Sequence, residues 1–147
     1  MKTNIKIKKL NNDAKVPTYG SEFSAGADLY ALTDIPVSIE PGETKLIHTG
    51  LAFAIPDGLV GLVFARSGLA TKQGIAPANK VGVIDSDYRG ELMVSLYNQS
   101  KETRIVENGD RIAQICFIPY YTAMFEQSDF LPETVRGEGG FGSTGTK

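Results

Sequence analysis

Residues 82–98 read GVIDSDYRGELMVSLYN, and this stretch places an alternating apolar run directly after a group of polar and turn-forming residues. Leu92, Val94 and Leu96 recur at every second position, which is the period of a β-strand with one buried face. The residues before them, Gly82–Gly90, hold two acids, a tyrosine and a turn signal, so we expect a β-hairpin there. The stretch predicts a strand that follows a polar hairpin.

The same β pattern extends over most of the chain. Alternation recurs at Leu51, Phe53 and Ile55, and again at Ala113, Ile115 and Phe117. Turn signals separate the runs, at Glu40–Glu43, Pro56–Gly58, Asp87–Gly90 and Glu107–Asp110. One helix is expected over Gly68–Gln73, with Ser67 as its N-cap and Gly74 as its stop. Many short strands with a single helix predict an all-β sandwich, jelly roll or barrel rather than an α/β fold.

Composition favours one soluble globular domain. The chain has 147 residues, of which 41% are hydrophobic, and its formal net charge is only −2. Non-specific nucleic-acid binders carry a strong basic excess, so we expect no direct nucleic-acid binding. A small anionic ligand needs only a local cluster of cations and is compatible with this balance.

Two residue types that occur once each limit the metal and redox chemistry. Cys116 is the sole cysteine, so no intrachain disulfide forms, and we expect it to be a small buried hydrophobe. His48 is the sole histidine and lies in the strand-like segment Lys45–Thr49. Because nothing near it resembles a nucleophile elbow, we interpret it as an ordinary surface or core residue. One cysteine and one histidine are too few for a structural zinc site.

The sequence predicts neither export nor membrane insertion. The basic start resembles the first part of a signal peptide, but lysines alternate with Ile5 and Ile7 and no continuous apolar segment follows. The longest apolar stretch, Leu59–Ala65, is far shorter than the roughly 20 residues that a membrane span requires. We therefore expect a cytoplasmic protein with no membrane partner.

The C-terminal residues differ in composition from the rest. From Gln127 onward the apolar alternation ends and glycine accumulates, and residues 136–145 read RGEGGFGSTG. We therefore divide the chain into a β-barrel, residues 1–126, and a mobile arm of the same domain, residues 127–147. Residues 137–142 match the G-x-G-x-x-G fingerprint, but too little chain remains for the helix that a dinucleotide-binding fold needs.

Five polar clusters remain that could carry chemistry, at Ala25–Ala31, Ala65–Ala70, Gly82–Gly90, Asn108–Gln114 and in the glycine-rich tail. The second places a guanidinium and a hydroxyl at the start of the expected helix, where N–H groups and the helix dipole suit a phosphate. Each cluster alone also has a structural explanation. Asp28 could cap a turn, Asp110 and Arg111 could form a surface ion pair, and the tail could be a linker. Together the clusters favour a ligand site.

In this order, and over Asp28–Thr144, the five clusters resemble the five motifs of the trimeric dUTPase family. The resemblance implies an all-β, jelly-roll-like distorted barrel with one short helix and a flexible glycine-rich tail. It also implies a homotrimer whose active sites lie at the subunit interfaces and combine residues of different chains. The implied enzyme is an Mg²⁺-dependent dUTP diphosphatase, which releases dUMP and pyrophosphate, keeps uracil out of DNA and supplies dUMP for thymidylate synthesis.

The resemblance also assigns roles around the reacting phosphate and the base. Asp85 matches the general base that activates a water for attack on the α-phosphorus. Tyr88 matches the ring that packs on the deoxyribose and leaves no room for a 2′-hydroxyl. The positions that match the base pocket and its surroundings are Asn79, Gly82, Val83, Ile84 and Met93.

Other motifs match the contacts to the phosphates and the metal. Arg66, Ser67 and Gly68 match contacts to the α- and β-phosphates, and Gln114 matches a γ-phosphate contact. Asp28 matches the acid that orients the water shell of Mg²⁺, an ion that keeps its waters and prefers phosphate oxygens. The remaining arginine of these motifs, Arg111, is interpreted as a structural neighbour.

The tail is expected to act as a lid that closes over the nucleotide. Phe141 matches the aromatic residue that stacks on uracil, and the other matched substrate contacts are Arg136, Gly142, Ser143 and Thr144. The chain departs from the family pattern before Arg66, where many members have proline and this sequence has Phe64-Ala65. We interpret this departure as a change in loop stiffness.

Three alternatives compete with the phosphohydrolase. A dCTP deaminase has a similar barrel and releases ammonia, but its active-site pattern is not found in this sequence. A non-catalytic interaction module would leave Asp85, Arg66 and Gln114 without a role. A structural jelly roll would leave the arginine and the phenylalanine of the tail unexplained.

Overall fold

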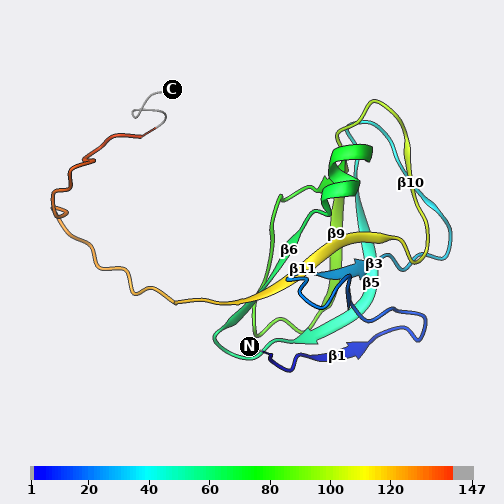
Figure 1. Ribbon diagram of the computed structural model, residues 1–147, viewed down its shortest axis with the longest axis horizontal. Coiled ribbons are helices and arrows are strands. Elements are labelled where there is room, and N and C mark those ends of the chain that lie inside the picture. The colour runs from blue at the N-terminus through cyan, green and yellow to red at the C-terminus, as the bar shows by residue number, and fades with distance from the viewer. Residues whose placement is uncertain (1, 141–147) are drawn as a thin grey trace.

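The computed structural model describes residues 2–140, and its strands pair in an antiparallel manner throughout that range (Figure 1). A four-stranded sheet has the order β1-β5-β9-β7, a five-stranded sheet has the order β2-β3-β11-β6-β8, and β10 pairs with β4 in a short ribbon. The four-stranded sheet comprises β1 (Lys6–Lys9), β5 (Thr44–Ala54), β9 (Glu91–Asn98) and β7 (Ile75–Pro77). The five-stranded sheet comprises β2 (Thr18–Tyr19), β3 (Ala27–Tyr30), β11 (Arg111–Pro119), β6 (Leu59–Phe64) and β8 (Gly82–Ile84). The ribbon comprises β4 (Val37–Ile39) and β10 (Arg104–Val106).

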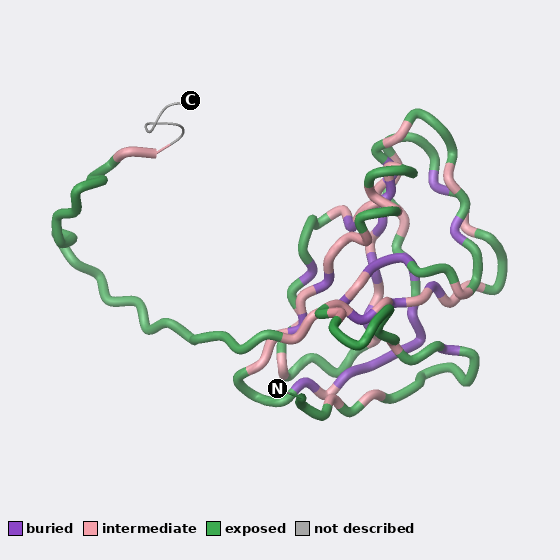
Figure 2. The backbone as a smooth tube through the Cα atoms, viewed as in Figure 1, coloured by how far each residue is buried: buried purple, intermediate pink, exposed green. Residues whose placement is uncertain are grey.

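Both sheets contribute to one apolar core (Figure 2). In β9, Leu92, Val94 and Leu96 are at most 2% exposed, and each residue between them is only partly buried. The alternation predicted for this strand is confirmed. Ile47 of β5 and Ile115 of β11 complete the contact between the two sheets from their own buried faces.

Three of the predicted turns are confirmed by backbone hydrogen bonds that close them. The N–H of Glu43 donates to the carbonyl of Glu40 (2.9 Å), and the N–H of Leu59 donates to that of Pro56 (3.2 Å). The N–H of Asp110 donates to the carbonyl of Glu107 (3.1 Å). Turn chemistry is local, which is why the sequence predicts it well.

The helix covers the predicted residues, because residues 67–68 are α-helical and run directly into a π-helical turn. η1 (Leu69–Gln73) is a single π-helical turn, and Gly74 ends it with φ +71°, a left-handed conformation that favours glycine. The predicted stop is therefore confirmed. The prediction of Ser67 as the N-cap is wrong, because Ser67 is itself helical and no side-chain hydrogen bond caps the helix. Because so short a helix aligns few peptide dipoles, its dipole contributes little to the binding of a phosphate.

The hairpin predicted at Gly82–Gly90 is also wrong. β8 lies at the edge of the five-stranded sheet and pairs with β6, whereas β9 lies inside the four-stranded sheet between β5 and β7. Residues 85–90 therefore connect the two sheets, through a turn in which the N–H of Tyr88 donates to the carbonyl of Asp85 (3.2 Å). A turn signal shows where the chain reverses. Long-range packing decides which sheet the following strand joins.

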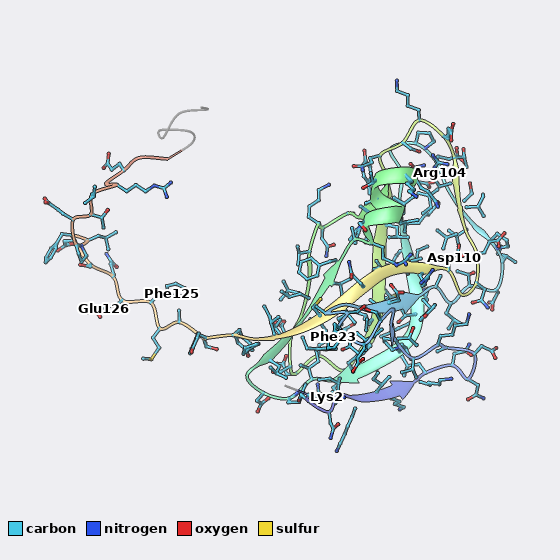
Figure 3. All side chains as sticks on the ribbon, in the orientation of Figure 1. Lys2, Phe23, Arg104, Asp110, Phe125 and Glu126 are labelled. Carbon is cyan, nitrogen blue, oxygen red and sulfur yellow. The ribbon has the colours of Figure 1, made fainter. Side chains whose placement is uncertain are left out.

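After β11 the chain leaves the barrel. Residues 120–138 are exposed and extend away from the sheets (Figures 1 and 3). Phe125 and Glu126, labelled in Figure 3, lie on this segment, and the Phe125 side chain is 98% exposed. The division of the chain at residue 126 stays a prediction. Over residues 2–140, no helix has the length and apolar character needed to cross a membrane.

Candidate functional site

Three of the five polar clusters meet in one surface cavity of about 440 Å³. Sheet pairing brings them together: Asp28 of β3 lies opposite Gln114 of β11, and Gln114 lies opposite Phe64 of β6. The predicted site residues that line the cavity are Asp28, Arg66, Ser67, Gly68 and Gln114, together with Arg111. The cavity therefore combines two guanidinium groups, a hydroxyl, an amide and a carboxylate.

Asp28 is the centre of this cavity's charge network. Its side chain is only 13% exposed, and its Oδ1 accepts a hydrogen bond from Arg66 Nε at 2.7 Å. Its Oδ2 accepts a second one from Arg111 Nη1 at 3.3 Å. Arg66 also donates from Nη1 to the carbonyl of Arg111 at 3.4 Å. The carboxylate thus fixes Arg66 at the cavity and also contacts the more exposed Arg111.

The alternative in which Asp110 and Arg111 form a surface ion pair is not what the structure shows. The carboxylate of Asp110 accepts the backbone N–H of Glu107 at 2.8 Å and closes the turn before β11. Arg111 instead faces Asp28, which is 83 residues away in the sequence.

Gln114 holds the loop that carries Arg66. Its Nε2 donates to the carbonyl of Ala65 at 2.9 Å. Its side-chain oxygen packs against Gly26 so closely that a Cβ on Gly26 would collide with it. A larger residue at Gly26 would therefore displace the amide of Gln114. Cys116 lines the same cavity, and burial raises the pKa of its thiol, which keeps it neutral near pH 7.

A second cluster lies along β8 and the connection that follows it. Gly82 pairs with Val63 of β6, and a Cβ on Gly82 would approach Val63 at 3.2 Å and the side chain of Asn79 at 3.5 Å. Asp85 is exposed at the end of β8. Tyr88 donates from its hydroxyl to the carbonyl of Glu91 at 2.9 Å.

The structure does not bring Asp85 and Arg66 together within one chain. β8 runs antiparallel to β6, with Ile84 opposite Gly61, so the chain reaches Asp85 beside the beginning of β6. Arg66 follows the other end of β6. The two positions are about six residues apart along the strand direction, which corresponds to about 20 Å. The general-base candidate and the phosphate cavity are therefore separate in the single chain.

The other predicted contacts lie outside both clusters. Met93 faces away from the core, because its neighbours Leu92 and Val94 face inward, and it lies opposite His48. Arg136 is exposed, and its Nε donates to the carbonyl of Gly139 at 2.7 Å. Four further predicted residues, Phe141, Gly142, Ser143 and Thr144, lie outside the described residues.

Comparison with known proteins places the chain in a family. A model of the dUTPase family matches residues 12–145. The chain belongs to the dUTPase family. The deoxyuridine 5′-triphosphate nucleotidohydrolase of Rickettsia felis is 50% identical over 144 residues, which is 97% of each protein. The enzyme of the same name from Desulfitobacterium hafniense (strain DSM 10664 / DCB-2) is 52% identical and covers 96% of this chain and 95% of its own length.

A solved dUTPase structure has the same fold. The dUTPase of Staphylococcus bacteriophage 80alpha with dUPNHPP superposes with a TM-score of 0.86 at 29% identity. The match covers 99% of this chain and 100% of the phage chain. The expected all-β, jelly-roll-like fold with one short helix and the resemblance to the dUTPase family are confirmed.

Two side chains that the sequence did not single out support the second cluster of this family member. Arg89 Nη1 donates to the carbonyls of Ser86 (2.6 Å) and Tyr88 (2.9 Å) and so fastens the connection after β8. Glu91 accepts from His48 and from a backbone N–H in β5. His48 is an exposed surface residue, as predicted, but its pairing with Glu91 had no signal in the sequence because 43 residues separate the two.

Side chains that could enclose a metal are not grouped in the described part of the chain. Within residues 2–140 there is no set of three or more His, Cys, Asp or Glu side chains close enough to hold an ion.

Proposed function

We propose that this chain hydrolyses dUTP to dUMP and pyrophosphate by water attack on the α-phosphorus, with Asp85 as general base and Mg²⁺ as cofactor. The chain is a dUTP nucleotidohydrolase, at 50–52% identity to full-length enzymes of that name. The proposal concerns how its residues perform the reaction. The observation that carries it is the cavity in which Asp28 holds Arg66 beside Ser67 and Gly68.

The cavity suits the triphosphate because its cations are already oriented. A guanidinium has five N–H donors, and the contacts to Asp28 and to the Arg111 carbonyl use only part of those of Arg66. The donors that remain are available for phosphate oxygens, which guanidinium groups bind in a bidentate manner. Oriented donors stabilise charge that builds on the phosphate during attack without having to rearrange.

The base site is proposed at β8. An edge strand presents alternate backbone N–H and C=O groups away from the sheet, and β8 is such a strand. These groups can pair with the polar edge of uracil, and a narrow backbone pocket at this position would leave little room for the methyl group of thymine. A donor facing the exocyclic amine of cytosine would remain unpaired, which disfavours that base.

The separation of the two clusters supports a homotrimer with shared active sites. Asp85 must lie beside the α-phosphate, yet it is about 20 Å from Arg66 along β6 in the same chain. A dUTP that is bound by Arg66 of one chain can meet Asp85 only if a neighbouring chain supplies it. We therefore propose that each site combines the phosphate cavity of one copy with the β8 region of another.

Exposed apolar side chains give independent support for the trimer. Val83 of β8 is 62% exposed, and the segment after β11 carries large apolar residues that are at least 80% exposed. In that segment they are Tyr121, Met124, Phe125, Phe130, Leu131 and Val135. So much apolar surface is unfavourable in water, and neighbouring copies of the chain would cover it.

The residues around Asp28 fit an indirect role with Mg²⁺. A carboxylate offers about four acceptor positions, and Arg66 and Arg111 take one on each oxygen, so water molecules of a hydrated ion can still bind. Mg²⁺ keeps several waters and prefers phosphate oxygens, which agrees with an acid that contacts its water shell. When bound, the ion would neutralise charge on the phosphate oxygens.

The substrate is tested by measuring pyrophosphate release from dUTP, dTTP, dCTP and UTP in parallel, with and without Mg²⁺. We expect release from dUTP, much less from the other three, and loss of the reaction when Mg²⁺ is chelated. Ammonia or dUTP formed from dCTP would instead identify a deaminase. Binding of dUTP without pyrophosphate release would identify a non-catalytic module.

The shared site is tested by complementation between two inactive variants. Arg66→Ala removes a phosphate contact and Asp85→Asn removes the general base, so each variant alone should be nearly inactive. When the two are refolded together, mixed trimers should contain sites with Arg66 from one chain and Asp85 from another, and activity should return. No recovery in mixtures that light scattering shows to be trimeric would refute the arrangement.

A further inference from the structure

Glu91 connects the second cluster to a rigid point in the other sheet. It is the first residue of β9 and directly follows the connection, residues 85–90, that carries Asp85 and Tyr88. Its side chain is only 22% exposed. Its side-chain carboxylate contacts His48 and Gly50 of β5, and its backbone carbonyl accepts a hydrogen bond from Tyr88.

On the β5 side, the carboxylate binds a bulge. The β5–β9 register shifts between His48 and Ala52, and Gly50 within the bulge has φ +68°. The N–H of Gly50 donates to Glu91 Oε1 at 2.7 Å, and His48 Nδ1 lies 2.9 Å from Oε2. A Cβ on Gly50 would meet the Leu32 side chain at 2.5 Å and the Ala14 side chain at 2.8 Å, so the bulge is tightly packed.

The backbone carbonyl of Glu91 holds the side chain of Tyr88 in the second cluster. The hydroxyl of Tyr88 donates to the Glu91 carbonyl at 2.9 Å. The Tyr88 ring lies so close to Gly90 that a Cβ there would collide with it. The ring therefore folds back on the chain and is fixed at its hydroxyl end by the residue that the bulge holds.

We infer that Glu91 is a positioning residue that anchors the Tyr88 ring to the β5 bulge and thereby strengthens the discrimination between dUTP and UTP. The inference rests on the proposed function, in which the Tyr88 ring packs on the deoxyribose and excludes a 2′-hydroxyl. A ring that is fixed at one end cannot move aside for the extra oxygen. A ring without this anchor can shift to admit the 2′-hydroxyl, so kcat/KM for UTP rises relative to kcat/KM for dUTP.

The test measures kcat/KM for dUTP and for UTP in wild type, Glu91→Ala and Glu91→Gln. Glu91→Ala should lower the dUTP/UTP ratio of kcat/KM by about three- to tenfold, the factor that one ordinary hydrogen bond supplies. Glu91→Gln keeps an acceptor for the Gly50 N–H and should restore most of the ratio. If Glu91→Ala does not fold, Glu91→Asp takes its place, because its shorter side chain cannot reach both Gly50 and His48.

Glu43→Ala is the matched control. Glu43 also accepts a backbone N–H, from Glu40 at 2.9 Å, and also contacts a basic side chain, Lys45, but it lies just before the start of β5, away from the bulge. This variant should lose some thermal stability and keep the wild-type ratio. An equal fall of the ratio in Glu43→Ala and Glu91→Ala would show that general destabilisation is the cause and would overturn the inference.

A double-mutant cycle tests the route from Glu91 to the sugar. Tyr88→Phe removes the hydrogen bond to the Glu91 carbonyl, so adding Glu91→Ala should change the ratio little further, whereas independent residues would give additive effects. Absence of dUTP hydrolysis by wild type would refute the proposed function itself. A wild type that hydrolyses dUTP selectively, with an unchanged ratio in Glu91→Ala, would refute only the role of Glu91.

Discussion

Replacing Asp28 with asparagine removes the charge that organises the phosphate cavity and leaves the size of the side chain nearly unchanged. In the wild type, Oδ1 accepts from Arg66 at 2.7 Å and Oδ2 accepts from Arg111 at 3.3 Å. Asparagine can keep only one of these contacts, because its amide nitrogen is a donor and would face the other guanidinium. Arg66, whose side chain is 28% exposed, loses its charged partner in either orientation of the amide. In one of the two orientations it also loses its hydrogen-bond acceptor.

The magnitude follows from the exposure of the three groups. A hydrogen bond to a charged partner contributes about 1.5–3 kcal/mol to stability when it is largely buried. The Arg111 side chain is 52% exposed, so solvent screens its pair with Asp28 and that pair adds little. We therefore expect Asp28→Asn to lower the free energy of unfolding by about 1.5–3 kcal/mol. The same loss at the transition state corresponds to a fall of about 10- to 160-fold in kcat/KM for dUTP.

Two assays at equal protein concentration measure these effects. Thermal unfolding should show a Tm lowered by roughly 2–4 °C for each kcal/mol lost. Pyrophosphate release should show the fall in kcat/KM. Asp57→Asn, in the exposed turn Pro56–Gly58, changes the same functional group away from the cavity and should leave both quantities at wild-type values. A kcat/KM for Asp28→Asn within about twofold of wild type would refute the role of Asp28 in orienting Arg66.

Three further outcomes are expected. Asp85→Asn should lower kcat by about 10²- to 10⁴-fold with little change in KM, and a smaller effect in steady-state kinetics would argue against a general base at this position. Truncation after Leu131 should leave a folded barrel, seen by circular dichroism, that has lost most of its activity, and an unfolded product would contradict the lid role. Burial alone raises the pKa of Glu91, but hydrogen bonds from His48 and Gly50 outweigh it and leave the pKa below 4.5. The ionised Glu91 side chain therefore stabilises the fold above pH 4.5, and this contribution is lost as the pH falls through the lowered pKa. Glu91→Gln has no such group to protonate. When the stability of each protein is expressed relative to its value at pH 7, wild type should therefore begin to lose stability at a higher pH than Glu91→Gln.

The positions of individual strands and turns could be read from the sequence because they depend on neighbouring residues. Alternation marked β9 and β11, and the turns at Glu40–Glu43 and Glu107–Asp110 close as expected. The helix start was less accurate, since Ser67 has the side chain of an N-cap but is itself helical and makes no capping hydrogen bond. The partner of β9 was wrong, because alternation shows which face of a strand is buried and says nothing about which strand lies beside it.

The candidate site divides in the same way. The order of the five polar clusters, which include Asp28, Arg66 and Asp85, carried the resemblance to a family, and the comparisons confirm that family. The ion pairs of Asp28 span 38 and 83 residues of sequence, and the Glu91–His48 contact spans 43. Such contacts exist only after β3, β6 and β11 have paired and the two sheets have closed on one core.

By itself, the sequence determined that this protein is an all-β dUTPase family member, because strand period, turn chemistry and motif residues are properties of short segments of chain. The tertiary structure decided which carboxylate holds which arginine, and it decided that Asp85 and the phosphate cavity stand apart in one chain. The physical reason is that antiparallel pairing carries the chain back along β6, so the residues that follow β8 move away from Arg66, whereas Asp28 and Arg111, distant in sequence, lie beside it.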